Sequence, residues 1–402
     1  MVVFEALKGP PVAEQAVEIV ERKGLGHPDV ITDRVVEAVS VALSREYLRR
    51  FGTVLHHNID KGLLVAGRAQ KAFGGGRLLR PMELVVGDRA TFQAERERVP
   101  VREIVVETAR QWFLRNLRFV EPERHLKVRV ALAPGAAQLV DIFRRGGPPG
   151  ANDTSCAAAH WPPTDTEQAV LALEQFLNSR AFKARLPETG EDVKVMGLRQ
   201  GRRLHLVVAM PLLDRFIRSE AQYFALKEMV LQDIVRHFVP RFRDRFEALE
   251  VELNALDARG RGLEGIYLSV LGTSAEDADS GQVGRAGRAG GLITPMRPMS
   301  LEAPSGKNPV SHVGKLYNVL AQRLARQLYE KVGGMKETQV FILSRIGAPL
   351  GRPLMVSVKV MLQRGASLRQ IQRRAQPLLE QALQGLPSLG KALATGRLKL
   401  FT

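Results

Sequence analysis

The sequence predicts an α+β protein made of antiparallel sheets, each covered by helices on one face. Short β-branched or alternating stretches are mixed with longer stretches that carry apolar residues at helical spacing, without the strict strand–helix alternation of a parallel sheet. Pairs of predicted strands alternate with helices about three times, which favours antiparallel layers. With 402 residues, 45% of them hydrophobic, the chain is long enough for two or three domains.

The elements follow from the spacing of apolar residues along the chain. Helical spacing predicts helices over residues 34–48, 101–117, 166–179, 219–238 and 313–332. Alternation and β-branching predict strands over 17–21, 126–132, 192–198, 204–210, 249–253, 266–271, 338–343 and 355–362. Glycine and proline predict loops over 144–155, 185–192 and 274–307, and a loop of the last length is typical of a functional segment.

The charge of the chain narrows the possible ligands. The formal net charge is +17 and the sequence pI is about 10.4. Such a chain either attracts a polyanion such as a nucleic acid or binds a substrate that carries several phosphates. The basic residues are spread among acidic ones, so charge alone leaves both interpretations open.

Compartment and redox chemistry follow from what the sequence lacks. No apolar run has the length of a membrane span, and the N-terminus has no signal-peptide pattern, so we expect a cytoplasmic protein. Cys156 is the single cysteine, which excludes an internal disulfide and a multi-cysteine metal site. We expect its thiol to pack as a small apolar side chain.

The stretch "ERKGLGHPDVITD" predicts a strand, a glycine turn and a helix that begins near Pro28. Asp29 and Asp33 lie four residues apart on one face of that helix, and His27 stands at its N-terminal edge. Free N–H groups at a helix start bind anions, and the carboxylates could hold a cation. The alternative is that these aspartates only complement the helix dipole.

A second constellation is "GTSAEDADSGQVGRAGRAGGLITP", residues 272–295. Glycine recurs every third residue from Gly281 to Gly290, with Arg285 and Arg288 between the glycines and Glu276, Asp277 and Asp279 before them. Glycine permits close backbone approach and arginine binds phosphate in a bidentate way. A flexible linker or an RNA-binding arginine–glycine segment remains an alternative.

A third constellation, "LEAPSGKNPVSHVGK", is not a P-loop, because Leu301 and Asn308 occupy positions that need glycine and Ser/Thr. It places Lys307, His312 and Lys315 near a helix start, where lysine suits phosphate binding. A solvated helix start is equally consistent with this stretch.

Two smaller motifs complete the set. In "GANDTS", Asn152 and Asp153 lie in a loop where an Asx-turn is the simpler interpretation. In "GEDVKVMG", Asp192 and Lys194 lie on one face at a strand start, where an exposed ion pair is the simpler interpretation.

Together these segments resemble the archaeal-type S-adenosylmethionine synthetase family, also called methionine adenosyltransferase. The resemblance runs in order from "VEIVERKGLGHPD" through "HHNIDKGLLVAGRA", "FGGG", "GANDTS", "GEDVKVMGL", "YLSVLGTSAE" and "GRAGGLITPMRPMS" to "SGKNPVSHVGKLYNVLA". It implies three α+β domains related by pseudo-threefold symmetry, in a homodimer with active sites between subunits. Their approximate regions are 1–150, 151–270 and 271–402, with the domains discontinuous in sequence.

The resemblance also implies the reaction. The sulfur of L-methionine attacks C5′ of ATP and expels triphosphate, which is then cleaved to pyrophosphate and phosphate. Mg²⁺, expected twice per site, and K⁺ are the implied ions. A neutral thioether needs no general base, so positioning and charge stabilisation carry the catalysis.

Site roles transfer from the family motif by motif. His27 is expected on the phosphate chain near the breaking bond, with Asp29 on one magnesium. Lys194 is expected on the α-phosphate with Asp192 nearby, and Asp279 faces methionine and nucleotide. The remaining expected site residues are Arg285 on the phosphates, Ser305 and Lys307 in the triphosphate cradle, Asp153 in the substrate loop, Arg288, Ala303, His312, Lys315, Asp60, Lys61 and Gly135 as further substrate contacts, and Asp33 as a second metal ligand.

A basic nucleic-acid-binding protein is the alternative from another class. It predicts tight binding that weakens steeply with salt and does not require methionine. It leaves the "GHPD" cluster and the acids before the glycines unexplained, since carboxylates repel a polyanion.

Overall fold

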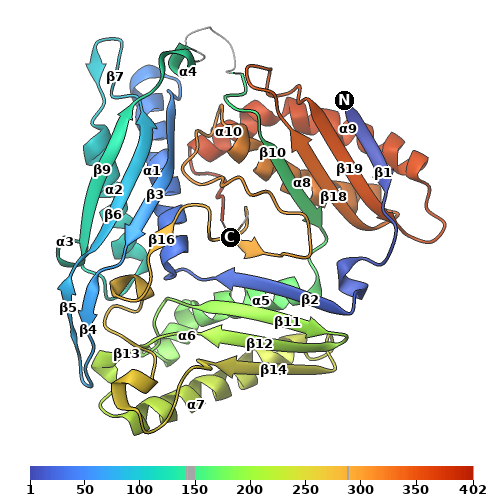
Figure 1. The fold of residues 1–402 in the computed structure, drawn as a ribbon. Coiled ribbons are helices and arrows are strands. Elements are labelled where there is room, and N and C mark those ends of the chain that lie inside the picture. The colour runs from blue at the N-terminus through green and yellow to red at the C-terminus, as the bar shows by residue number, and fades with distance from the viewer. Residues whose placement is uncertain (142, 144–149, 288, 402) are drawn as a thin grey trace.

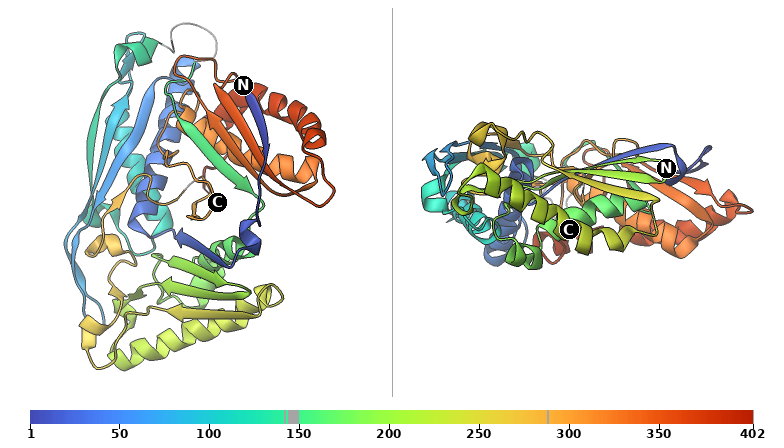
Figure 2. Two further views of the ribbon diagram at one scale, coloured as in Figure 1. Left: turned by 45° about the vertical axis from the view of Figure 1, so that its right-hand side comes forward. Right: turned by 90° about the horizontal axis from the view of Figure 1, so that it is seen from below.

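The computed structural model describes residues 1–141, 143, 150–287 and 289–401. Three larger sheets surround a centre in which the C-terminal segment lies (Figure 1). Seen from below, strands lie toward one side of the molecule and helices toward the other (Figure 2). Each sheet has its own hydrophobic core. The predicted α+β class, with helices covering one face of mostly antiparallel sheets, is confirmed.

The first sheet has the order β16-β3-β6-β9. Its strands β3 and β6 are antiparallel, whereas β6 and β9 are parallel. Helices α1 and α2 pack on this sheet and bury residues such as Val35, Leu64 and Phe113. The bounds are α1 Pro28–Phe51, β3 His57–Val65, β6 Met82–Ala90, α2 Val101–Asn116, β9 Leu126–Pro134 and β16 Gly281–Gln282.

The second sheet has the order β14-β12-β11-β2-β17. Only its β12–β14 pair is parallel. Helix α5 packs on β2 and β11, and α7 packs on β14. The bounds are β2 Val17–Lys23, α5 Asp165–Leu177, β11 Lys194–Gln200, β12 Arg203–Ala209, α7 Glu220–His237, β14 Ala248–Leu253 and β17 Leu292–Ile293.

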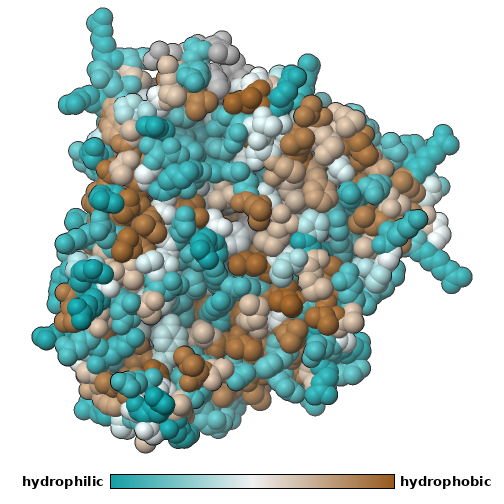
Figure 3. All heavy atoms as spheres, viewed as in Figure 1, coloured by the Kyte–Doolittle hydropathy of each residue, from teal (hydrophilic) through white to brown (hydrophobic). Residues whose placement is uncertain are grey.

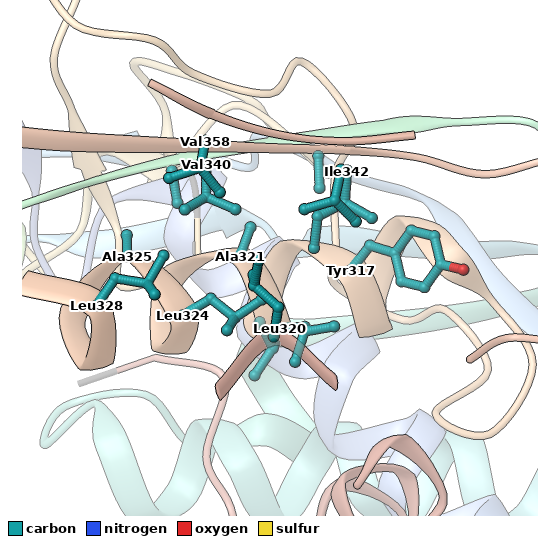
Figure 4. Close-up of a cluster of buried hydrophobic side chains, with 14 of the residues drawn as sticks. Tyr317, Leu320, Ala321, Leu324, Ala325, Leu328, Val340, Ile342 and Val358 are labelled. Atoms are coloured by element: carbon teal, nitrogen blue, oxygen red, sulfur yellow. The ribbon is translucent and has the colours of Figure 1, made fainter. Parts of the chain in front are cut away.

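The third sheet has the order β1-β19-β18-β10, with β1 and β19 parallel. Helix α8 packs on this sheet, with Ala321 and Ala325 turned toward the strands that carry Val340 and Ile342 (Figure 4). Leu324 is fully buried. The bounds are β1 Val2–Ala6, β10 Cys156–Trp161, α8 Val313–Val332, β18 Met335–Leu343, β19 Met355–Leu362, α9 Leu368–Gln384 and α10 Leu386–Ala394.

The three units repeat one plan: a helix, an antiparallel strand pair, a second helix and a parallel edge strand. The strand before each first helix pairs with the sheet of another unit. β2 precedes α1 but joins the second sheet, β10 precedes α5 but joins the third, and β16, upstream of α8, joins the first. Each first helix therefore begins at a seam between two sheets.

Shorter elements connect these units. No helix in the described residues is long and apolar enough to cross a bilayer. The remaining elements are β4 Arg68–Gln70, β5 Arg77–Arg80, β7 Gln93–Ala94, β8 Glu97–Arg98, α3 Pro122–His125, α4 Ala137–Asp141, α6 Arg180–Arg185, β13 Leu212–Leu213 and β15 Leu268–Ser269, with 3-10 turns at Val12–Glu14, Asp214–Phe216, Val239–Phe242, Gly262–Gly265 and Ser274–Glu276.

Two expectations are wrong. The strand expected over 266–271 forms only the two-residue strand β15, because the chain there turns toward the loop at Gly272. Cys156 is exposed at the start of β10 rather than packed in a core. The predicted loop over 274–307 is confirmed apart from the one turn and two short strands within it.

Candidate active site

The "GHPD" turn joins β2 to α1 at the seam between the first and second sheets. Helix α1 begins at Pro28, as predicted, with His27 as its N-cap. A Cβ on Gly26 would lie 2.5 Å from the amide nitrogen of Asp192, so only glycine lets this turn lie against the loop before β11. The amide of Gly26 donates to the carbonyl of Glu191 at 2.9 Å.

His27 is held as a neutral hydrogen-bond donor. Its Nδ1 accepts the amide of Asp29 at 3.2 Å. Burial lowers the pKa of His27 to about 4; Asp29 opposes this shift, and the cations Lys23, Lys194 and Arg285 add to it. The ring is therefore uncharged near neutral pH. Because Nδ1 accepts a hydrogen bond, the proton sits on Nε2, which can donate to an anion.

One face of α1 binds two distant loops. Asp29 accepts the amide of Gln282 at 2.9 Å, and Asp33, one turn later, accepts that of Gly284 at 2.9 Å. Glu37, another turn along, accepts the amide of Gly306 at 3.0 Å. The glycine-rich loop and the Ser-Gly-Lys turn are thus both fixed to the same helix.

Asp33 on α1 holds the glycine-rich loop in place, so its carboxylate is not an open coordination site. Burial raises the pKa of Asp33 to about 6, against the stabilising bond from Gly284. Both oxygens of Asp29 also have partners, the amide of Gln282 and the ammonium of Lys23 at 2.8 Å. Unlike Asp33, Asp29 lies beside His27, since its charge acts on the pKa of that ring.

Asp192 lies in the loop before β11 and is buried, so an exposed ion pair is the wrong interpretation for it. Its carboxylate accepts the amide and the hydroxyl of Ser274, at 2.8 and 2.5 Å. Burial raises its pKa to about 7, and the charges of Asp279 and Asp29 add to the shift. Lys194 is partly exposed and lies 3.4 Å from Glu21.

A second cluster surrounds the Ser-Gly-Lys turn. Lys307 is buried, pairs with Asp60, and lies 2.8 Å from Glu302. Lys61 binds Asp60 at 2.6 Å from the exposed side. These pairs raise the pKa of Lys307 although its burial acts in the opposite direction, so its ammonium is retained. Lys315 is fully buried against Glu37 at 2.6 Å, which makes it a structural partner of α1.

His312 and the "GANDTS" loop adjoin this cluster. His312 caps α8 through Nδ1, which accepts the amide of Gly314 at 3.1 Å. Burial lowers its pKa to about 3, and Lys307 adds to the shift. The amide of Asn152 reaches the carbonyl of Ser311 at 3.3 Å. Asp153 accepts the amide of Thr154 at 2.7 Å and is partly exposed.

Three further predicted residues differ in their placement. Ala303 is brought against Gly284, since a Cβ on that glycine would lie 2.9 Å from it. Gly135 directly follows β9, and a Cβ there would lie against His56 and Val140. Arg288 lies outside the described residues.

Sequence reasoning missed the residues that support the "GHPD" turn. Lys23, the last residue of β2, bridges Asp29 and the carbonyl of Arg285, 2.7 Å away. Lys183 is buried and donates to Thr189 Oγ1 at 3.1 Å and to the carbonyl of Gly190 at 2.5 Å. Lys23 could have been found from the sequence, because it is a basic residue directly before the glycine turn. No pattern in "RAFKAR" indicates Lys183.

The carboxylates fit a magnesium ion that is shared with a substrate. No group of three or more His, Cys, Asp or Glu in the described residues is arranged to hold a metal. Mg²⁺ needs no such cage, because it keeps waters and takes one or two carboxylates together with substrate phosphates. The charges of Asp29 and Asp279 both act on Asp192, so the three carboxylates lie close together. This concentration of negative charge suits a cation.

Comparisons with known proteins identify the family of the chain. Residues 1–397 match the family model described as S-adenosylmethionine synthetase. The chain is 42% identical over 408 residues to the S-adenosylmethionine synthase of Caldivirga maquilingensis, covering 100% of this chain and 99% of that protein. It is 41% identical to the enzyme of that name from Methanothrix thermoacetophila, over 99% of this chain and 98% of that protein.

A solved structure shares the fold. The Campylobacter jejuni structure described as an unusual S-adenosylmethionine synthetase aligns with a TM-score of 0.59 at 14% identity, over 93% of this chain and 100% of that one. The family match spans nearly the whole chain and takes in both charged clusters. The chain belongs to the S-adenosylmethionine synthetase family.

Proposed function

We propose that this protein makes S-adenosylmethionine in the cytoplasm from ATP and L-methionine. The methionine sulfur attacks C5′, the C5′–O bond breaks, and triphosphate leaves with the bonding electrons; water then cleaves triphosphate to pyrophosphate and phosphate. One observation carries the proposal: α1 joins the "GHPD" turn, the glycine-rich loop and the Ser-Gly-Lys turn, each of which brings groups suited to phosphate.

The residues supply positive charge and hydrogen bonds to the leaving group. Neutral His27 donates from Nε2 toward the phosphate chain near C5′. Lys23, Lys194 and Arg285 lie near it as cations, and their charges add to the lowering of the pKa of His27 by burial. Lys307 provides the charge at the other cluster. Such preorganised groups stabilise the charge that develops on a departing triphosphate.

Asp29 is the protein ligand we assign to Mg²⁺, with Asp192 and Asp279 close by. Mg²⁺ would neutralise the phosphate oxygens and hold the chain for in-line displacement. We assign K⁺ to the oxygens around Asn58 and Asp60, whose side chains are joined by a hydrogen bond of 3.0 Å. Omission of each ion from the assay tests whether that ion is required.

We propose that two copies associate through their sheet faces. Val17 and Ile19 of β2 and Leu63 of β3 are 36%, 38% and 42% exposed although they are apolar strand residues. Hydrophobic patches interrupt the hydrophilic surface on the face viewed in Figure 3. Burial of such a face against a second copy removes apolar surface from water. Light scattering of the purified protein measures the mass directly.

The decisive experiment incubates purified protein with ATP, methionine, Mg²⁺ and K⁺ and follows S-adenosylmethionine, pyrophosphate and phosphate by mass spectrometry. We expect all three products, and none of the first without methionine. His27→Ala should lose the product, while His237→Ala, at the exposed end of α7, should retain it. Absence of product in the wild type together with salt-dependent RNA binding would instead favour the nucleic-acid alternative.

A further inference from the structure

A large cavity lies away from both charged clusters, between α5 and α8. Its volume is about 680 Å³, within the usual range for small-molecule sites. Its walls are mainly apolar and come from several elements: Ala159 and Trp161 of β10, Leu171 of α5, Val319 of α8, Leu292 of β17, and Leu400. The C-terminal segment that contributes Leu400 lies at the centre of the three units (Figure 1).

The cavity occurs where the repeated plan of the fold changes. Glu37, Glu174 and Gln322 stand at the same position counted from the starts of α1, α5 and α8. Glu37 pairs with Lys315 of α8 at 2.6 Å, and Glu174 pairs with Arg22 at 3.0 Å. Gln322 is neutral and, among the described residues, donates to the carbonyl of Ala289 at 3.2 Å. Two seams are thus closed by buried ion pairs, whereas the seam that holds the cavity has a neutral residue.

Positive charge surrounds the apolar walls. Arg323, Lys331 and Lys399 line the cavity and form no ion pair with a described carboxylate. Arg326 is held by Glu330 at 2.8 Å and lies 5.4 Å from the Trp161 ring. The lining contains two acids, and both are paired: Glu167 lies 3.1 Å from Arg297, and Glu330 is the partner of Arg326. The cavity therefore offers flat apolar surface together with three cations that pair with no carboxylate of the described residues.

We propose that this cavity is a second binding site, for a small organic anion with a flat apolar body. The body would lie against Trp161, Leu171 and Val319, and the acidic group would meet Arg323 and Lys399. The site also touches Ala289 and Gly290, on the back of the glycine-rich loop. The amide of Gly290 donates to the carbonyl of Leu400 at 3.2 Å, so an occupant contacts both partners of that bond. This inference does not depend on the proposed activity.

The chain offers a built-in reporter. It has two tryptophans, Trp112 and Trp161, so Trp112→Phe leaves only the one in the cavity wall. We would titrate this protein with 8-anilinonaphthalene-1-sulfonate, a flat aromatic anion, and follow energy transfer from Trp161. We expect saturable quenching at one site per chain, unaffected by saturating ATP.

Charge reversal tests the site directly. Arg323→Glu with Lys399→Glu should weaken binding by about ten-fold or more, because two cations are replaced by repulsion. Arg369→Glu with Arg373→Glu makes the same charge change on the exposed face of α9. This control should alter the affinity for the probe less than about two-fold. Leu171→Gln, which makes the wall polar without charge, should also weaken binding.

Three results would overturn the proposal. One is no saturable quenching of Trp161. Another is equal weakening by the two double variants, which would show that only overall charge matters. The third is competition by ATP, which would place the probe in the site around His27. Circular dichroism of each variant establishes that the protein titrated is folded.

Discussion

The starts of α1 and α5 occupy equivalent places in two repeats, but their capping side chains differ in the hydrogen bonds that they form. At α5, Thr164 forms a capping box with Glu167 and also donates to Glu18 at 2.6 Å. At α1, His27 uses only Nδ1 for the cap. The α5 start is saturated by the protein itself, while the α1 start keeps a donor for something else. The repeated plan places a helix start at each seam. The capping residue then determines whether that helix start has a free hydrogen-bond donor for a ligand.

The charged residues around the two helix starts differ in the same way. At α5, Glu167 is neutralised by Arg297 and meets His160 at 3.0 Å, all within buried structure. At α1, burial raises the pKa of Asp192, and the charges of Asp279 and Asp29 add to the shift. The start of α8 resembles α1, because His312 also caps through Nδ1. Stability at α5 and activity at α1 can therefore be changed separately.

The largest expected effect is on stability at α5. Arg297→Met should lower the free energy of unfolding by about 3–5 kcal/mol, because it leaves Glu167 and Glu337 buried without their cation. Denaturant unfolding measures this change. Arg326→Met, on an exposed arginine, should shift it by about 0.5 kcal/mol or less. A small loss for Arg297→Met would mean that the network is not holding the seam.

The next effect is on activity at α1. His27→Asn retains a good N-cap but removes the Nε2 donor, so kcat should fall at least about 100-fold while stability changes by about 0.5 kcal/mol or less. Product formation and thermal unfolding are measured on the same sample. Thr164→Asn is the matched change at α5 and should leave kcat within about two-fold. Full activity of His27→Asn would remove the proposed role of the ring.

A smaller effect is expected from the α5 cap. Thr164→Ala removes a cap and a bond to Glu18, which should cost about 1–2 kcal/mol of stability. The turnover of the folded enzyme should stay within about two-fold. If turnover fell instead in proportion to stability, the two helix starts would not be functionally separate.

The smallest effect concerns pH. Folding raises the pKa of Asp192 to about 7, so the folded state binds its proton more tightly than the unfolded state does. This contribution to stability is present at low pH and is lost as pH rises from about 4 to 7. The Tm of the ligand-free protein should therefore fall between these pH values. Asp192→Asn should reduce this fall by at least about 2 °C. Asp165→Asn, in the first turn of α5, should leave the slope unchanged.

Much of the fold could be read from local patterns. The helix predicted over 313–332 and the strand over 355–362 have the observed bounds of α8 and β19. Strand β10, "CAAAHW", was missed because its alanines have low strand propensity; pairing with β18 decides its conformation. Helix α9 was missed because Pro377 lies inside it. Tertiary packing overrides local preference at both places.

The candidate site divides in the same way. Glycine spacing and charged residues indicated which segments handle phosphate, but not that α1 would gather them. Its bonds to Gln282 and Gly284 span 253 and 251 residues, and its ion pair with Lys315 spans 278. No periodicity reports contacts at such separations. Lys183 was missed for a different reason: Thr189 and Gly190 are near it in the sequence, but no local pattern shows that the loop after α6 folds back onto its ammonium.

The sequence by itself determined the segment types, the start of α1 at Pro28 and the chemistry available at each motif, because these depend on neighbouring residues. Only the tertiary structure decided which groups are charged and which are free to bind. Burial makes His27 neutral and raises the pKa of Asp192. Packing closes two seams with ion pairs and leaves a cavity at the third. Protonation and free space depend on the surroundings of a residue, and the surroundings exist only once distant segments have packed together.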